Sequence, residues 1–273
     1  MPLTAIQKRI LDVIKANRSP ESYLAGGAVL NRAWPRLSDD LDIFCDNEAS
    51  IVDQAKIDIR ALEKNGFTVS MNLMQYALAE VEVRSGQDRC IVQWMDETVR
   101  RFFPIQQDQY FGWRLHDADL AVNKIIAGAS RCKVRDAVDL AKIHTDYIPL
   151  SYLAWAAAGK TPLTPADILE RVVKNAVSHP DPEFAEVRAS VPVNGRDVVM
   201  TLMSARDEGL LLAEQLPSDT YGCLFVRDGD VLPASLDEIA AGSAKAWKVS
   251  EYGSWPSFPD QPAPTPVRRP RPF

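Results

Sequence analysis

The spacing of apolar residues divides the chain into a first part that mixes strands with helices and a second part that is mainly helical. Isoleucines recur at every fourth position over 6–14, directly after Thr4, which predicts an amphipathic helix with Thr4 as its N-cap. Apolar side chains also share one face of the segment 48–64, and Gly66 follows it as a helix stop. The pattern therefore predicts two helices early in the chain.

Short apolar runs bounded by turn residues predict the strands of this first part. A brief helix, about 28–34, is expected to follow Gly26-Gly27 and to end at Pro35. The expected strands are 23–25, 41–44, 67–73, 77–84 and 90–94.

A helical period dominates from Asp117 onward. The run Cys223–Pro233 is expected to form a small hairpin that turns at Asp228-Gly229. In the last of the expected helices, a run of Val, Met and Leu also leaves room for a strand. The expected helices are 117–131, 134–147, 165–178 and 197–215.

These elements predict an α+β fold, in which a small mixed β-sheet domain is followed by a mainly helical region. We expect the sheet domain to occupy residues 1–112 and the helical region residues 113–254. The remaining segment, 255–273, holds 7 of the 19 prolines in the chain and is expected to be an extended, mobile tail.

Composition is that of a globular protein, with 46% hydrophobic and 25% charged residues in a chain of 273. The net charge of −6 argues against a protein that holds nucleic acid by non-specific electrostatics, although a local basic patch would still allow RNA contact. The N-terminus mixes charges among its apolar residues, and no apolar run is long enough to span a bilayer. Scattered cysteines without a metal-binding spacing fit reduced thiols. We therefore expect a cytoplasmic protein without a membrane partner.

Two carboxylates in a strand otherwise due for burial provide the first sign of chemistry. Side chains at i and i+2 of a strand point to the same side, so Asp40 and Asp42 project together while Leu41 and Ile43 face the core. Two carboxylates held that close repel one another unless a cation lies between them. A hard cation such as Mg²⁺ prefers oxygen ligands and is usually completed by substrate phosphates. The pair therefore predicts a divalent-cation site with a phosphate-bearing ligand.

A glycine pair at a strand-to-helix turn adds to this prediction. Gly26 and Gly27 leave backbone N–H groups accessible beside a helix N-terminus, an arrangement that favours anions. Taken singly, a glycine pair is usually only a turn, and two aspartates separated by one residue are usually a surface feature. Their order here, strand, glycine pair, helix, strand, aspartate pair, with Arg36 and Ser38 just before the carboxylates, favours a functional site.

These residues carry a resemblance to a known group of enzymes. The spacing from Gly26-Gly27 to Asp40 resembles the signature of the DNA polymerase β-like nucleotidyltransferase superfamily. The fuller pattern, with Arg36, Ser38 and the DLDIF run, is similar to AbiEii-type nucleotidyltransferase toxins of abortive-infection and toxin–antitoxin systems. The later block 119–143, with a lysine on one helix and an RDxxDL segment on the next, supports the narrower match.

The resemblance implies a role for each matching residue. The glycine pair would hold the triphosphate, and Asp40 and Asp42 would bind Mg²⁺, or Mn²⁺ in its place. Arg36, Ser38 and Lys124 would contact the nucleotide. Separately, Arg131 lies seven residues after Lys124 on the same helix face, so Arg131 with Arg135 is expected to add positive charge near a phosphate. Asp136 would lie near the active centre, with Asp139 one helical turn further on. The implied catalytic set is Asp40, Asp42, Lys124 and Asp136.

The resemblance also implies the reaction and its partners. A nucleoside monophosphate would pass from a nucleoside triphosphate to an acceptor hydroxyl, and pyrophosphate would leave. An RNA acceptor such as tRNA is expected, with a protein hydroxyl as the alternative, and a cognate antitoxin is an expected partner of a toxin. A structural salt bridge remains the alternative role for Asp136 and Asp139.

One departure from the superfamily pattern bears on the mechanism. Many members carry a third carboxylate on a neighbouring strand as the general base, whereas the matching strand here has Gln93. Glu82, Asp96 or Asp136 would have to replace it. A nucleotide-binding module without transferase activity is therefore a second interpretation. An aminoglycoside-type small-molecule nucleotidyltransferase is a third, which the RDxxDL block disfavours.

Overall fold

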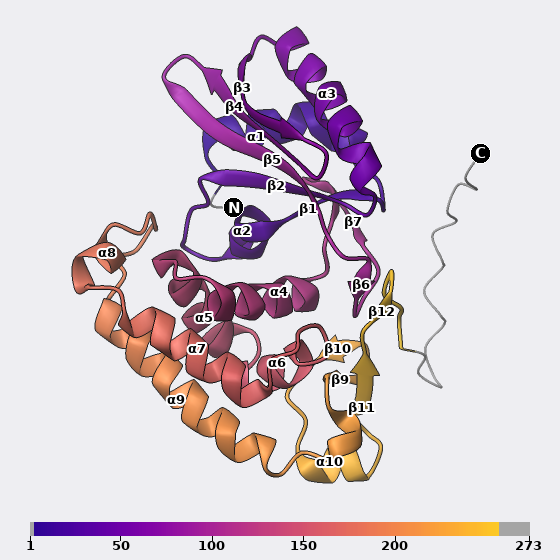
Figure 1. Ribbon diagram of the computed structural model, residues 1–273, viewed down its shortest axis with the longest axis vertical. Helices are drawn as coiled ribbons and strands as arrows, with labels where there is room; N and C mark the ends of the chain where they lie inside the picture. The colour runs from indigo at the N-terminus through magenta and orange to yellow at the C-terminus, as the bar shows by residue number, and fades with distance from the viewer. Residues whose placement is uncertain (1–2, 257–273) are drawn as a thin grey trace.

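The computed structural model of the protein describes residues 3–256. A seven-stranded mixed sheet forms the upper half of Figure 1, with strand order β3-β4-β5-β2-β1-β8-β7. Strand β2 lies in its middle, antiparallel to β1 and parallel to β5. The strands are β1 (Ser22–Ala25), β2 (Asp40–Cys45), β3 (Thr68–Gln75), β4 (Leu78–Ser85), β5 (Asp88–Asp96), β7 (Gln106–Asp108) and β8 (Gly112–Arg114).

Helices cover both faces of this sheet. On one face lie α1 (Ala5–Ile14) and α3 (Glu48–Lys64), which contact each other as well as the sheet. The other face carries α2 (Gly26–Leu30), which is followed by a 3₁₀ turn (Asn31–Ala33) and packs on β2 and on the helical region. Leu41 and Ile43 of β2 are fully buried, so the alternation along this strand separates a core face from the face of Asp40 and Asp42.

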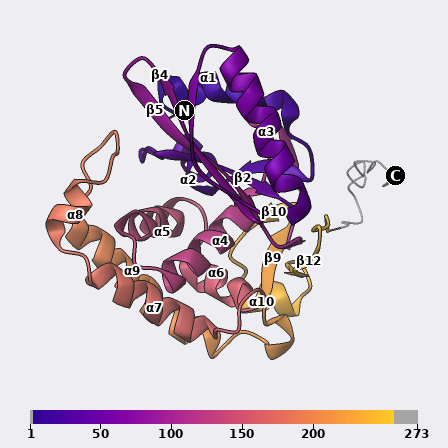
Figure 2. The ribbon, with the colours of Figure 1, turned by 45° about the horizontal axis from the view of Figure 1, so that its top comes forward.

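The helical region packs beneath α2 and the sheet (Figures 1 and 2). Its central helix α4 contacts α2, α5, α6 and α7. A small three-stranded sheet with order β10-β9-β11 follows the helices. The helices are α4 (Asp117–Ser130), α5 (Val134–Asp146), α6 (Leu150–Ala157), α7 (Pro165–Val177), α8 (Asp181–Ala185), α9 (Gly195–Ala213) and α10 (Leu236–Ala240). The small sheet comprises β9 (Cys223–Arg227), β10 (Asp230–Val231) and β11 (Lys245–Lys248).

The chain then returns to the first half of the molecule. Strand β12 (Ser250–Glu251) pairs with β6 (Arg100–Arg101). Beyond it, the ring of Trp255 packs against Phe103 and His116, with ring centroids 5.5 Å and 5.6 Å away. The tail predicted from residue 255 thus begins with a packed aromatic side chain, and its part from 257 onward lies outside the described residues.

The structure confirms the predicted α+β fold class and most of the predicted elements. The helix expected over 48–64 has those bounds, and Thr4 caps α1 in a capping box with Gln7. The hairpin turns at Asp228 and Gly229, both of which have positive φ. Segment 197–215 is helical, as α9, rather than a strand. Strand β8 crosses the boundary that we expected after residue 112. Among residues 3–256, no helix has both the length and the apolarity needed to cross a membrane.

A buried ion pair holds α3 against the N-terminal segment. Asp58 is fully buried, and its carboxylate accepts hydrogen bonds from Arg18, from Asn17 Nδ2 at 2.7 Å and from Trp94 Nε1 at 2.8 Å. Removing one member of such a cluster leaves an uncompensated buried charge, which costs more than the pair contributes.

We predict that Asp58→Ala lowers the free energy of unfolding by about 3–5 kcal/mol, because it leaves the Arg18 guanidinium buried without its counter-charge. Asp53→Ala, at an exposed position of the same helix, is the matched control and should change it by less than about 0.5 kcal/mol. Urea denaturation measures the free energy of unfolding of both variants. Equal stabilities of the two variants would contradict the prediction.

Candidate functional site

A cleft of about 270 Å³ lies between the central strands of the sheet and the helices α4 and α5. It gathers segments that are far apart in the sequence: the β1–α2 turn, the loop before β2, strands β2 and β5, and α4. Eight predicted site residues line it: Gly26, Gly27, Arg36, Ser38, Asp40, Asp42, Lys124 and Arg131. Arg135 lines it as well.

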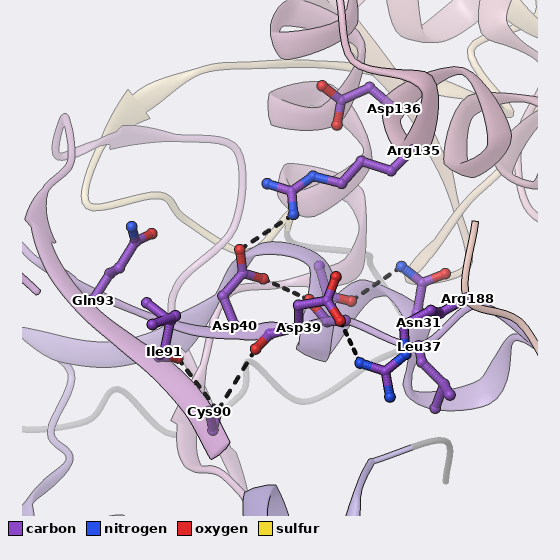
Figure 3. A network of polar contacts seen from close by, with 12 residues as sticks. Asn31, Leu37, Asp39, Asp40, Cys90, Ile91, Gln93, Arg135, Asp136 and Arg188 are labelled. Atoms are coloured by element: carbon purple, nitrogen blue, oxygen red, sulfur yellow. Dashed lines mark hydrogen bonds and ion pairs between the residues drawn. The ribbon is translucent and has the colours of Figure 1, made fainter. Parts of the chain in front are cut away.

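Asp40 and Asp42 face this cleft from β2. Asp40 accepts a hydrogen bond from Ser38 Oγ at 2.7 Å on one carboxylate oxygen. Its other oxygen lies 3.3 Å from Nη1 of Arg135, which reaches across from α5 (Figure 3). Burial, together with the negative charge of Asp40, raises the pKa of Asp42 to about 6. The two carboxylates therefore repel each other, as the sequence predicted.

The glycine pair makes room for these side chains. Gly26 has φ +64°, and a Cβ at this position would lie 1.7 Å from Oδ2 of Asp42. A Cβ on Gly27 would lie 2.7 Å from Nη2 of Arg36 and 2.8 Å from Oγ of Ser38. Both positions thus require glycine because the side chains of the cleft approach the backbone closely.

A chain of ion pairs fixes the cationic wall of the cleft. Lys124 Nζ lies 2.9 Å from Asp136 and 3.0 Å from Asp139. Arg36 makes a bidentate pair with Asp139, with N–O distances of 2.5 Å and 2.9 Å. Arg131 pairs with Asp136 through Nε at 2.7 Å. Two carboxylates of α5 therefore hold three cations from other segments.

Asp136 lies behind Lys124 and is not among the residues that line the cleft. Its burial opposes ionisation, but the hydrogen bond from Arg131 and the charge of Lys124 outweigh it and lower the pKa of Asp136. A buried carboxylate paired with two cations is a weak proton acceptor. This geometry favours the salt-bridge role for Asp136, in which it positions Lys124 and Arg131, over the alternative of general base.

Gln93 occupies the place beside Asp42 at which a third carboxylate was considered. The two residues are direct partners in the parallel pairing of β2 with β5, and both line the cleft. The amide Nε2 of Gln93 donates to Glu80 at 2.6 Å. Glu80 of β4 is thus the carboxylate that contacts Gln93. Glu82, which the sequence offered as a substitute, pairs instead with Arg84 and Arg89. Sequence reasoning missed Glu80 because strand register, rather than any motif, places it opposite Gln93.

The far end of the cleft is more apolar. Here Glu97 and Asn123 provide polar groups, and burial raises the pKa of Glu97. Asn123 donates to Glu97 at 3.2 Å and accepts from Lys160 at 2.7 Å. Sequence reasoning did not single out these three residues, since their contacts are long-range. Four apolar side chains line this end of the cleft: Phe44, Met95, Leu115 and Leu120.

The carboxylate pair fits a divalent cation. A cation between Asp40 and Asp42 would offset the burial and the repulsion from Asp40 that together raise the pKa of Asp42, and oxygen ligands are the type that Mg²⁺ and Mn²⁺ bind. No cluster of three or more His, Cys, Asp or Glu side chains suited to a metal occurs within residues 3–256. The remaining ligands of such an ion would therefore be water, Gln93 or substrate oxygens.

Comparisons with known proteins bear on the fold. No protein-family model matches the sequence. The curated proteins likewise contain no significant match. Among solved structures, the chain resembles a protein from H. pylori described provisionally as a nucleotidyltransferase, with TM-score 0.50, 16% identity, and coverage of 77% of this chain and 94% of that one. It also resembles MenT4, a nucleotidyltransferase toxin from Mycobacterium tuberculosis, with TM-score 0.53, 13% identity, and coverage of 78% and 83%.

These likenesses show that the chain has a nucleotidyltransferase fold. At such low identity they show the fold alone. The AbiEii-type assignment, the metal and the RNA acceptor remain predictions.

We predict that Asp42→Asn stabilises the protein at pH 7.5 in the absence of divalent cations. The pKa of Asp42 is raised in the folded state, so its ionisation destabilises the fold as the pH rises from about 4 to 6. The gain should be about 1–3 kcal/mol at pH 7.5 and should vanish near pH 3.5, where both states are protonated. Urea denaturation in EDTA at both pH values measures it. A destabilised variant at pH 7.5 would contradict this electrostatic account.

We predict that Gly26→Ala displaces Asp42 and lowers the affinity for Mn²⁺ by at least about tenfold, because a Cβ cannot coexist with Oδ2 of Asp42. Gly66→Ala is the matched control, since Gly66 also has positive φ but a Cβ there meets no atom within 4 Å. It should cost only about 1 kcal/mol of stability and leave Mn²⁺ binding unchanged. Isothermal titration calorimetry measures both affinities, and similar values for the two variants would contradict the prediction.

Proposed function

We propose that this protein is a nucleotidyltransferase that moves a nucleoside monophosphate from a nucleoside triphosphate to an acceptor hydroxyl. The observation that carries the proposal is the convergence, in one cleft, of two carboxylates on one strand face with Lys124, Arg131 and Arg135. Like the fold, this arrangement suits the binding of a cation and a polyphosphate together. When bound to Asp40 and Asp42, Mg²⁺ or Mn²⁺ would offset charge on the attacking and leaving oxygens.

The residues of the chain divide into those that bind and those that position. Lys124 and Arg131 face the phosphates, and their bonds to Asp136 hold them in place before substrate binds. Arg135, paired with Asp40 at 3.3 Å, is placed to exchange that carboxylate for a phosphate oxygen once a cation is bound. Gln93 cannot accept a proton and Asp136 is paired, so positioning and electrostatic stabilisation supply most of the catalysis.

The far end of the cleft would take the nucleoside. Phe44, Met95 and Leu120 provide apolar surface there, and Glu97 with Asn123 provides hydrogen-bonding groups. This composition is usual for a small-molecule pocket, in which apolar walls surround a few polar groups.

An RNA acceptor, and a role as the toxin of a toxin–antitoxin or abortive-infection system, follow from the resemblance in sequence. A depression beside the cleft has a small excess of positive charge, which suits an anionic acceptor. Its charged lining residues are Arg36, Lys133, Arg135 and Arg188, with Asp39, Glu183 and Glu186. MenT4, with which the chain shares its fold, is a nucleotidyltransferase toxin. An antitoxin that binds this protein would complete such a system.

We predict that the purified protein, given Mg²⁺ and each α-labelled nucleoside triphosphate in turn, transfers label to a component of total cellular RNA. Asp42→Asn should lower the transfer on the order of 100-fold or more, because it removes a metal ligand and its charge. The predicted stability of this variant at neutral pH separates loss of chemistry from unfolding. Gel separation of RNA and protein identifies the acceptor class.

Asp53→Asn is the matched control, since Asp53 is an exposed residue of α3 that lines neither the cleft nor the depression beside it, and it should retain transfer. Label on protein instead of RNA would show that the acceptor is a protein hydroxyl and would still support the proposed transfer reaction. Label on an aminoglycoside alone would indicate a small-molecule transferase. Metal-dependent nucleotide binding without transfer to RNA, protein or aminoglycoside would refute the transferase and leave a binding module.

A further inference from the structure

A second group of reactive side chains lies on the surface of the helical region, at the turn between α4 and α5. Cys132 is exposed there, and its Sγ lies 3.3 Å from Nε2 of His179. The other nitrogen of that ring, Nδ1, lies 2.6 Å from Oε2 of Glu183. A thiol, an imidazole and a carboxylate from three different segments thus form a continuous chain.

The carboxylate of Glu183 decides which ring nitrogen of His179 carries the proton. A carboxylate only accepts hydrogen bonds, so Nδ1 must be the donor and Nε2 presents its lone pair to the thiol of Cys132. Ser178 Oγ also lies 3.0 Å from Sγ, and the carbonyl oxygen of Asn175 lies 3.6 Å from the same sulfur, but neither oxygen is basic enough to take the thiol proton near neutral pH. His179 is therefore the base of the group.

Contacts around the group hold it in this geometry. Asn175 Nδ2 lies 2.8 Å from the carbonyl of Gly128 and 3.3 Å from that of Arg131, so it fastens the α4–α5 turn to α7. The His179 side chain is only 10% exposed and packs edge-on against Phe184, with ring centroids 6.1 Å apart. The imidazole is thus held in place while the thiol beside it is open to solvent.

We propose that Cys132 is a nucleophilic thiol, activated by His179 and oriented through Glu183, that forms mixed disulfides with small disulfide compounds. Nε2 of His179 accepts the proton of Sγ, and the sulfur attacks one sulfur of the disulfide. One S–S bond forms as the other breaks, and the departing sulfur takes the proton from the imidazolium. The disulfide is the sole co-reactant, and one thiol is released for each thiol consumed.

None of the three members of this site lines the nucleotide cleft, although Glu183 also lines the depression beside it. The charged groups next to it are Arg131 and Lys133 on its own segment and Glu183 on α8. Arg131 is already bound to Asp136, as described above. The remaining cysteines, Cys45, Cys90 and Cys223, are buried and serve as internal controls.

The test compares alkylation by iodoacetamide in the wild type, His179→Gln and Glu183→Gln, with the modified cysteine identified by peptide mass spectrometry. At pH 7, we expect Cys132 to react first, and His179→Gln to slow it by about tenfold or more. Glu183→Gln should give an intermediate rate. At pH 9.5 the three rates should converge, because a thiol ionises without help above about pH 8.5.

Incubation of the full chain with glutathione disulfide should then give one adduct on Cys132 and none in Cys132→Ser. Equal alkylation rates at pH 7 would overturn the proposal, since His179 would then not activate the thiol. Equal slowing at both pH values would overturn it as well, because it would show a change of access only. Failure of the glutathione adduct to form would refute the disulfide-exchange step.

Discussion

The bidentate pair between Arg36 and Asp139 is the interaction on which the cleft depends. It joins the loop before β2 to helix α5, and the same carboxylate lies 3.0 Å from Lys124 of α4. Burial opposes ionisation of Asp139, but Lys124 and Arg36 outweigh it and lower its pKa. One carboxylate with no exposed surface thus fixes three segments around a common point.

The positions of the polar groups that line the cleft follow from that pair. The chain runs from Arg36 through Ser38 to Asp40 at the start of β2, and Ser38 donates to Asp40. The anchored position of Arg36 therefore determines where these two side chains lie in the cleft. Buried ion pairs often contribute little net stability compared with apolar packing, whereas loss of one partner is costly. Here the cations that pair with Asp136 and Asp139 also line the cleft, so they determine where the proposed polyphosphate would bind.

Sequence reasoning found the parts of the fold that depend on local pattern. Alternation along β2 placed Asp40 and Asp42 on the face away from the core, and periodicity fixed the bounds of α3. Helix α6 went unpredicted because it is apolar on every side, so it shows no amphipathic period. The three-residue strands β7 and β8 have too few residues for a pattern, and only their pairing identifies them.

Sequence reasoning predicted the site residues that belong to a motif. It missed those that reach the site only through tertiary contacts. Gly26, Asp42 and Lys124 lie in segments with a recognisable spacing, and all three line the cleft. Glu80 meets Gln93 only through the antiparallel register of β4 with β5. Asp139 is absent from the catalytic set that the sequence implies, because nothing in the sequence indicates that Arg36, 103 positions away, is its partner.

The return of the chain through β12 has a mechanical consequence. The helical region leaves the sheet through β8. It is attached again to the first half of the chain where β12 pairs with β6, outside the seven-stranded sheet, and where Trp255 packs on Phe103. Two attachments confine the motion of the helical region relative to the sheet to rotation about the line that joins them. Any other opening of the cleft would strain one of the two attachments.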